Sequence, residues 1–159
     1  MSAETFPQIR CEEVVREDGC QELRVLYRGC GAATREALHI MTEGLRDFGI
    51  SEADLQTAQQ VMAEILNNVV EHAYADNLNG LIEIRLICEA SAIRAQIIDA
   101  GRPMPGEVAP DPAPPNPAGM PEGGFGWCII RAMTDEVSYV RERGRNNLSI
   151  AFRLHDTGR

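Results

Sequence analysis

Two polar residues spaced one helical turn apart are the first candidates for chemistry. Glu64 and Asn68 lie in the run AEILNNVVEHAY, and a helix turning about 100° per residue would stack them on one face. The amide oxygen is a hard, neutral ligand for Mg²⁺, and the carboxylate can orient or deprotonate an attacking hydroxyl. Taken alone, the pair is more typical of a solvated polar face, because a short motif is weak evidence.

An aspartate at the end of an apolar run is the second candidate. Asp99 follows AQII and begins Asp99-Ala100-Gly101. A partly buried carboxylate there can accept a hydrogen bond from the exocyclic amine of adenine, and it would reject guanine, which carries a carbonyl at that position. Gly101 would let the backbone approach the base. A simple Asp-x-Gly turn explains the same residues when they are taken alone.

Glycines before a helix-like run are the third candidate. Gly123-Gly124-Phe125-Gly126 leads into WCIIRAM. Glycine amides can point at phosphates, and the dipole of the following helix favours an anion. A flexible loop is the structural alternative. No Lys-Ser/Thr follows these glycines and G-x-G-x-x-G does not occur, which excludes a Walker A loop and a dinucleotide fingerprint.

The segments that must position these residues predict an α/β two-layer sandwich. Apolar residues at helical spacing predict helices over 34–48, ending near Gly49, and from Ser51 to about Tyr74; a third helix-like run covers 126–133. Strands are predicted over 9–16, 21–28, 81–89, 91–98, 136–142 and 147–154. Tight joins between strands, as at Asp18-Gly19, predict one largely antiparallel sheet with helices on one face and exclude a purely parallel one. No regular element is expected in the stretch up to Gly124 that holds eight of the nine prolines.

Composition narrows the class of protein. The 159 residues fit one domain, and 44% hydrophobic with 25% charged residues is ordinary for a soluble globular chain. A net charge of -9 argues against nucleic-acid binding, although a local phosphate site remains compatible with it. Five cysteines without C-x-x-C spacing, no signal peptide and no apolar run near ~18 residues predict a cytoplasmic protein with reduced thiols, no zinc site and no membrane span.

The order of the three candidates carries a resemblance to a known family. AEILNNVVEHAY, DAG and EGGFGWCIIRAMTDEV resemble the N-box and the two glycine boxes of the GHKL ATPases, over roughly residues 30–154. Within that superfamily the chain is most similar to the anti-sigma factor serine/threonine kinases of bacterial partner-switching systems. The resemblance implies a Bergerat ATP-binding fold in a single domain over 1–159, a Pro-rich ATP lid at about 102–123, and ATP with Mg²⁺ as cofactors.

The resemblance also implies a role for each matched residue. Glu64 would be the general base, and Asn68 would be the magnesium ligand. The residues implied to bind the nucleotide are Asn68, Asp99, Gly101, Gly124 and Gly126. His72 matches a histidine common in the N-box, but a structural histidine explains it equally well. Ser149 is aligned loosely with a hydroxyl near the adenine-binding aspartate.

Two departures from the family pattern bear on activity. Met104 stands where the family often has an aromatic residue, and the segment from Pro103 to Pro121 is richer in proline than an ATP lid is expected to be. Proline restricts the conformations available to a lid. ATP binding therefore remains the prediction, while rapid phosphoryl transfer is less well supported.

Three functions follow as hypotheses. The first is a serine/threonine kinase acting on an anti-sigma antagonist protein of the STAS type, with a sigma factor as a second candidate partner. The second is a nucleotide-binding module that sequesters its target without kinase activity. The Glu64–Asn68 pair favours the first, because a pure binder needs no general base. A histidine kinase is disfavoured because no dimerising helical hairpin precedes this region. A homodimer is implied by the resemblance alone.

Overall fold

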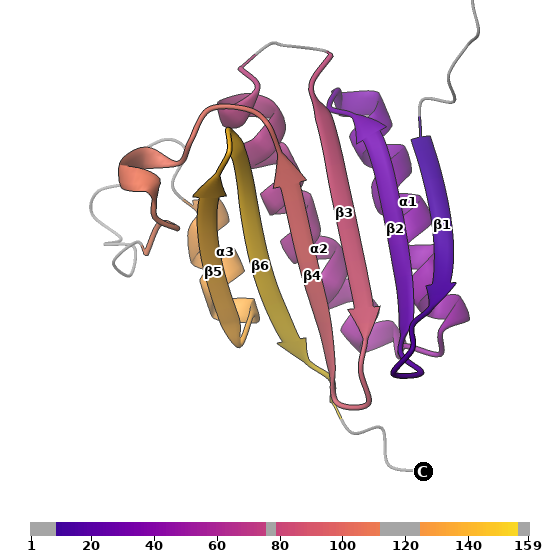
Figure 1. Cartoon of the computed structure of the whole chain (residues 1–159). Helices are drawn as coiled ribbons and strands as arrows, with labels where there is room; N and C mark the ends of the chain where they lie inside the picture. Colours follow the sequence, from indigo (N-terminus) through magenta and orange to yellow (C-terminus); the bar gives the residue numbers. More distant parts are fainter. Residues whose placement is uncertain (1–8, 76–78, 112–124, 156–159) are drawn as a thin grey trace, which may run out of the picture.

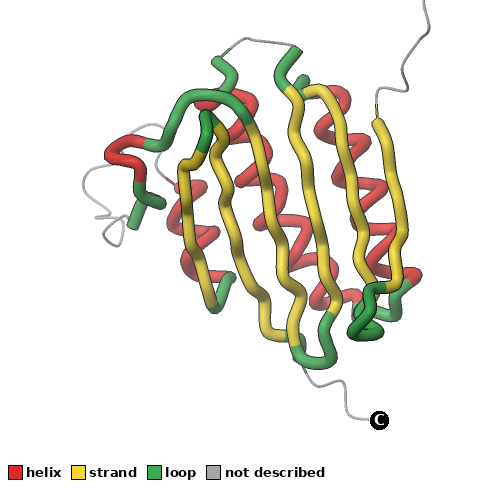
Figure 2. The backbone as a smooth tube through the Cα atoms, viewed as in Figure 1, coloured by secondary structure: helices red, strands yellow, loops and turns green. Residues whose placement is uncertain are grey.

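The computed structural model describes residues 9–75, 79–111 and 125–155, which form a sheet layer and a helix layer (Figures 1 and 2). The strands are β1 Ile9–Val15, β2 Gln21–Arg28, β3 Leu81–Cys88, β4 Ala92–Asp99, β5 Glu136–Glu142 and β6 Arg145–Arg153. The helices are α1 Gly31–Asp47, α2 Glu52–Asn68 and α3 Phe125–Met133. All three helices lie behind the sheet in Figure 1, on one of its faces.

The strand order is β1-β2-β3-β4-β6-β5, and every pairing is antiparallel. The predicted α/β sandwich with a mostly antiparallel sheet is therefore confirmed. The strands alternate apolar side chains toward the helices with polar ones toward the open face, as period-two alternation requires. The core lies between the layers, and its largest fully buried members include Leu23, Leu55, Ile65, Leu66, Ile84 and Ile97.

Local signals explain where α1 and α2 begin and end. α1 starts at Gly31, three residues before the predicted start, because Ala33 packs into the core one turn before Ala37. Phe48 caps its C-terminus, and Gly49 follows with a φ of +87°, a conformation that favours glycine. α2 begins as predicted: the hydroxyl of Ser51 accepts a hydrogen bond of 3.2 Å from the backbone N–H of Asp54.

A π-helical turn over Val69–Ala73 extends α2 and ends where the sequence predicted, just before Tyr74. The backbone N–H of Tyr74 donates to the carbonyl of Val69 at 2.9 Å, which closes the wider turn. The turn brings the carbonyl of Ala73 against the loop after β4, where the N–H of Arg102 donates to it at 2.7 Å. It therefore joins the helix layer to the sheet at the end of β4.

Two segments differ from the prediction. A 3₁₀ turn occupies Pro105–Glu107, where no regular element was expected, and proline at its start suits the fixed φ of that position. The last hairpin turns on Arg143-Gly144, whose φ values of +51° and +74° are both positive as in a type I′ turn. β6 consequently begins at Arg145, two residues before the predicted start.

Candidate functional site

A cavity of about 390 Å³ lies between α2, the π-helical turn, β4, β6 and α3. Its apolar walls come mainly from Ile65, Val69, Ile97, Met104, Trp127 and Leu148. Its polar groups come from Asn68, His72, Asp99, Arg102, Tyr139 and Asn146. An apolar slot with a few convergent polar groups is the usual form of a small-molecule site.

Asp99 supplies the acidic group of this cavity. Its side chain is only 6% exposed, and its Oδ1 accepts hydrogen bonds from Asn146 Nδ2 at 2.8 Å and from the N–H of Gly101 at 2.9 Å. Burial raises the pKa of the Asp99 carboxyl, while those two hydrogen bonds and the charge of Arg141 oppose that rise. Within the part of the chain that the structure describes, Oδ2 accepts no hydrogen bond, so it is available to a donor on a ligand.

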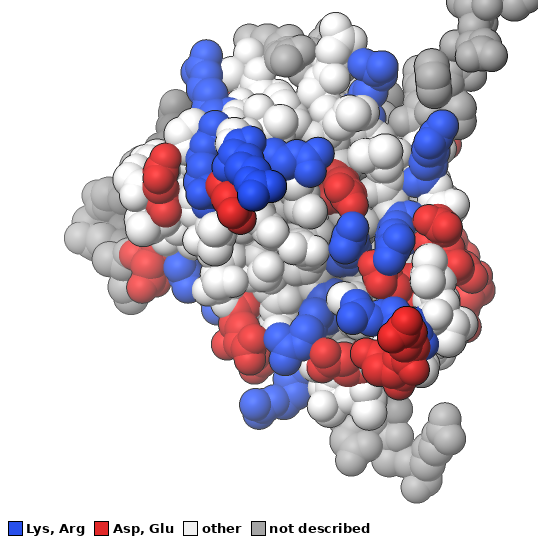
Figure 3. All heavy atoms as spheres, viewed as in Figure 1, with Lys and Arg blue, Asp and Glu red and all other residues white. Residues whose placement is uncertain are grey.

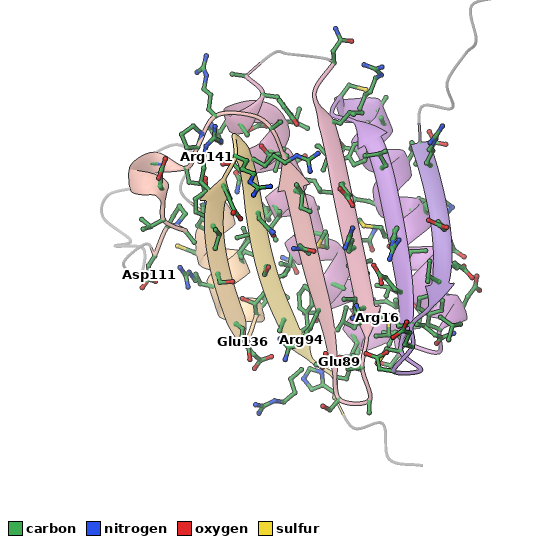
Figure 4. The ribbon with its side chains drawn as sticks, viewed as in Figure 1. Arg16, Glu89, Arg94, Asp111, Glu136 and Arg141 are labelled. Carbon is green, nitrogen blue, oxygen red and sulfur yellow. The ribbon has the colours of Figure 1, made fainter. Side chains whose placement is uncertain are left out.

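Residues from the last hairpin hold Asp99 in place. Asp99 on β4, Asn146 on β6 and Arg141 on β5 are successive partners in the strand register. Arg141 Nη1 donates to the carbonyl of Gly101 and to Asn146 Oδ1, both at 2.8 Å, and the N–H of Met104 donates to the Tyr139 hydroxyl at 3.1 Å. Figure 4 places Arg141 at this end of the sheet, opposite the end where Arg94 and Glu136 lie.

Tyr74 fixes the loop after β4 from the helical side. Its hydroxyl donates to the carbonyl of Leu81 and accepts a 2.9 Å hydrogen bond from the N–H of Ala100. Gly80 makes room for the ring, because a Cβ there would lie 2.4 Å from Tyr74 ring carbons. Burial raises the pKa of the Tyr74 hydroxyl, so it stays a neutral donor and acceptor.

Glu64 and Asn68 face the start of α3. A Cβ built on Gly126 would lie 2.8 Å from Glu64 Oε2 and 3.7 Å from Asn68 Nδ2, so the three residues converge. Asn68 Nδ2 is buried and has no hydrogen-bond partner among the described residues. An unpartnered amide nitrogen at a cavity wall suits a ligand, and turning the amide would present its oxygen to a cation. The donor set therefore fits Mg²⁺ held through Asn68 and the oxygens of a bound phosphate chain.

The other predicted site residues fall in different places. Gly101 adjoins the cavity, but the requirement for glycine comes from packing: a Cβ there would lie 2.4 Å from the carbonyl oxygen of Ala73. Gly124 lies outside the described residues. His72 is exposed and lines the cavity. Within the described ranges, no group of three or more His, Cys, Asp or Glu side chains is arranged to hold a metal ion.

The loose alignment of Ser149 with a hydroxyl near the adenine-binding aspartate is wrong. Ser149 pairs with Gln96 and Ser138 on the open face of the sheet, whereas Asp99 points toward the helices. Asn146 occupies the place beside Asp99 instead. The sequence prediction missed Asn146, because it starts the last strand at residue 147 and leaves residue 146 in the turn before it. Alternation backwards from Leu148 and Ile150 would have found it as a lone polar residue at a buried position.

Basic residues gather around the same end of the sheet. Figure 3 shows arginine side chains over the ends of β4, β5 and β6, and the chain has no lysine. Part of the segment predicted to be a lid is held against α3. Arg131 on α3 donates to the carbonyls of Pro110 at 3.0 Å and Ala109 at 3.3 Å. The residues 112–124 of that segment are outside the described ranges.

Comparison with known proteins gives the family. The model of the histidine kinase-like ATPase domain matches residues 31–152, which include the π-helical turn, Asp99 and α3. The chain belongs to this family. Serine-protein kinases RsbW from Staphylococcus aureus strains JH9 and Newman are 30% identical over 102 residues, which is 60% of this chain and 64% of theirs. The chain thus matches less than two thirds of the length of these relatives.

Solved structures agree on the fold. The RsbU and RsbW domains of Rv1364c from Mycobacterium tuberculosis align with 87% of this chain and 34% of that one, with a TM-score of 0.61 and 20% identity. The catalytic domain of histidine kinase ThkA aligns over 81% of this chain and 95% of its own, with a TM-score of 0.51 and 17% identity. The resemblance to the GHKL ATPases, and within them to the anti-sigma factor serine kinases, is confirmed at the level of the family.

Proposed function

We propose that the chain is a single ATP-binding domain that acts as a serine/threonine protein kinase on an anti-sigma antagonist of the STAS type. The observation that carries the proposal is one cavity lined by both Asp99 and Asn68. Among the described residues, Asp99 Oδ2 accepts no hydrogen bond and the buried Nδ2 of Asn68 has no partner. The Asp99 carboxylate can accept a hydrogen bond from an amine on a base, and the Asn68 amide can bind a phosphate group with its metal ion. Adenine nucleotides carry both.

In this proposal each residue has a distinct task. Asp99 Oδ2 accepts from the adenine amine, and the apolar walls, Trp127 among them, take up the base. Asn68 would hold Mg²⁺, which offsets phosphate charge when it is bound. Glu64, beside Gly126 at the start of α3, would accept the proton of the substrate serine or threonine hydroxyl. Positioning and electrostatics supply most of the catalysis in phosphoryl transfer, so this small set is sufficient.

Binding can be measured with a probe that the chain already contains. Trp127 is the only tryptophan, and it lines the cavity. ATP in the cavity should change its fluorescence in a saturable way, and Asp99→Asn should abolish the change at the same nucleotide concentration. Trp127→Phe gives the background signal.

Phosphotransfer is tested with a purified antagonist protein and γ-labelled ATP. The kinase predicts Mg²⁺-dependent labelling of a serine or threonine by the wild-type chain and about 100-fold or greater loss in Glu64→Gln with ATP binding kept. The alternative is a nucleotide-binding module that sequesters its target. ATP binding and ATP-dependent complex formation without labelled antagonist would decide for that alternative.

The partners and the compartment belong to the same proposal. A sigma factor is the second candidate partner, and a homodimer is a prediction that sedimentation can test. We place the protein in the cytoplasm, because all five cysteines are free thiols. Within the described residues no helix is long and apolar enough to cross a bilayer.

A further inference from the structure

Asn146 joins β5, β6 and the loop after β4 through a fully used side chain. Its Nδ2 donates to Asp99 Oδ1 and to the carbonyl of Arg102, both at 2.8 Å. Its Oδ1 accepts from Arg141 Nη1 at 2.8 Å and from the hydroxyl of Tyr139 at 2.5 Å. A carboxamide has two N–H donors and two oxygen lone pairs, so its capacity is filled. The side chain is 97% buried, since only 3% of the residue is exposed.

These partners allow the amide only one orientation. Arg141 can donate but cannot accept, whereas the carbonyl of Arg102 can accept but cannot donate. A flipped amide would set its N–H groups against the Arg141 guanidinium and its oxygen against Asp99. Asn146 therefore presents an N–H to the Asp99 carboxylate and cannot present an oxygen.

This orientation determines what Asp99 offers to a base. Asn146 Nδ2 and the N–H of Gly101 both donate to Oδ1, which leaves Oδ2 of this cavity-lining residue without a hydrogen bond from the described residues. An ionised Oδ2 accepts from an amine, as at the six-position of adenine. A protonated Oδ2 would donate instead and would match the carbonyl that hypoxanthine carries there. The choice between the two bases thus depends on whether Asp99 is ionised.

We propose that Asn146 sets the base preference of the pocket by holding Asp99 as an ionised acceptor with one free oxygen, which selects an amino-purine over an oxo-purine. The inference rests on the proposed nucleotide-binding function and names a positioning residue for it. Burial pushes Asp99 toward the neutral acid, and the hydrogen bond from Asn146 to its carboxylate opposes that. The other titratable or charged groups around Asp99 are Tyr139 and Arg141 from β5, His72 and Tyr74 from the helical side, and Arg102 from the loop.

The chain contains a matched control one residue away. Asn147 follows Asn146 on β6, and adjacent residues of a strand point to opposite faces. It stands between Ile98 and Val140 in the register, on the open face of the sheet. Asn146→Ala and Asn147→Ala therefore remove the same group from the two faces. Asn146→Asp keeps the shape while replacing the donor to Asp99 by a second carboxyl.

The experiment measures the dissociation constants of Mg·ATP and Mg·ITP for the full chain at pH 6 to 8, by Trp127 fluorescence and calorimetry. The wild type and Asn147→Ala should prefer ATP throughout this range, because Asn146 is intact in both. In Asn146→Asp, two adjacent carboxyls share a proton, so the ATP-to-ITP preference at pH 7.5 should fall by roughly tenfold or more. Asn146→Ala should shift in the same direction.

The outcomes distinguish a failure of the role of Asn146 from a failure of the proposed nucleotide binding. Folded Asn146 variants with the wild-type preference and pH profile would overturn the role of Asn146 while leaving ATP binding intact. If the Asn146 variants do not fold, a wild type that binds Mg·ITP as tightly as Mg·ATP overturns it equally. A wild type that binds neither nucleotide removes the proposed function, and this inference falls with it.

Discussion

Replacing Gly101 by alanine tests whether the loop after β4 must lie against the π-helical turn. A Cβ at this position would lie 2.4 Å from the carbonyl oxygen, 2.5 Å from the carbonyl carbon and 2.8 Å from the Cβ of Ala73. Two of these atoms are backbone, so no side-chain rotation relieves the clash. Overpacking costs about 1–3 kcal/mol, and disturbing the 2.7 Å hydrogen bond from Arg102 to Ala73 adds roughly 0.5–1.5 kcal/mol.

The free energy of unfolding should therefore fall by about 2–4 kcal/mol, which for a domain of this size lowers Tm by roughly 4–16 °C. Differential scanning calorimetry measures it. Gly31→Ala is the control, because a Cβ there meets nothing within 4 Å and its φ is not in the left-handed region; its Tm should stay the same or rise slightly. A Gly101→Ala protein that melts with the wild type would refute the packing argument, and glycine at 101 would then need another cause.

Three further outcomes follow from the described contacts. In Gly126→Ala the one close contact of the new Cβ is with the carboxylate end of Glu64, at 2.8 Å, and that side chain can turn aside. Tm should therefore change by little, while phosphotransfer assays show reduced labelling. Burial alone would raise the pKa of Asp54, but the hydrogen bonds from His155 and Ser51 outweigh it and lower that pKa. The stabilisation from the ionised group is therefore complete above about pH 4 and is lost as the pH falls through the lowered value. In an acid titration, Asp54→Asn should lose less stability than the wild type over that range. Burial raises the pKa of Asp99, so the ionised group costs stability at neutral pH, and Asp99→Asn without nucleotide should melt at the same temperature or higher, measured by calorimetry.

The sequence was sufficient to predict most of the elements and their layer. Alternating runs such as AQII and helical spacing in α2 reflect burial directly, so the strands and helices were placed to within a few residues. The order of the three motifs was sufficient to predict the family. The hairpin joins sufficed to predict an antiparallel sheet, because a tight turn cannot connect parallel strands.

The hydrogen bonds that hold Asp99 could not be predicted from the sequence, because they depend on the register between β4, β6 and β5. Asn146 and Arg141 come opposite Asp99 only once the turn is placed at Arg143-Gly144 and β6 is paired with β4. If the turn is placed two residues later, Asn146 becomes part of an exposed loop and no longer lies beside Asp99. The close packing of Gly101 against Ala73 likewise depends on the π-helical turn, and no local sequence pattern predicts that turn.

Nucleotide-dependent melting of the purified chain and of Asp99→Asn tests the central claim most directly. Mg²⁺ with ATP or ADP at 100 to 1,000 times the dissociation constant should stabilise the wild type by about 2.7–4.1 kcal/mol. GTP at the same concentration should have little effect, and Asp99→Asn should fold but lose the response to adenine nucleotides. A wild type whose Tm is unchanged by any of the three nucleotides would contradict the account and leave a protein that works through contact alone.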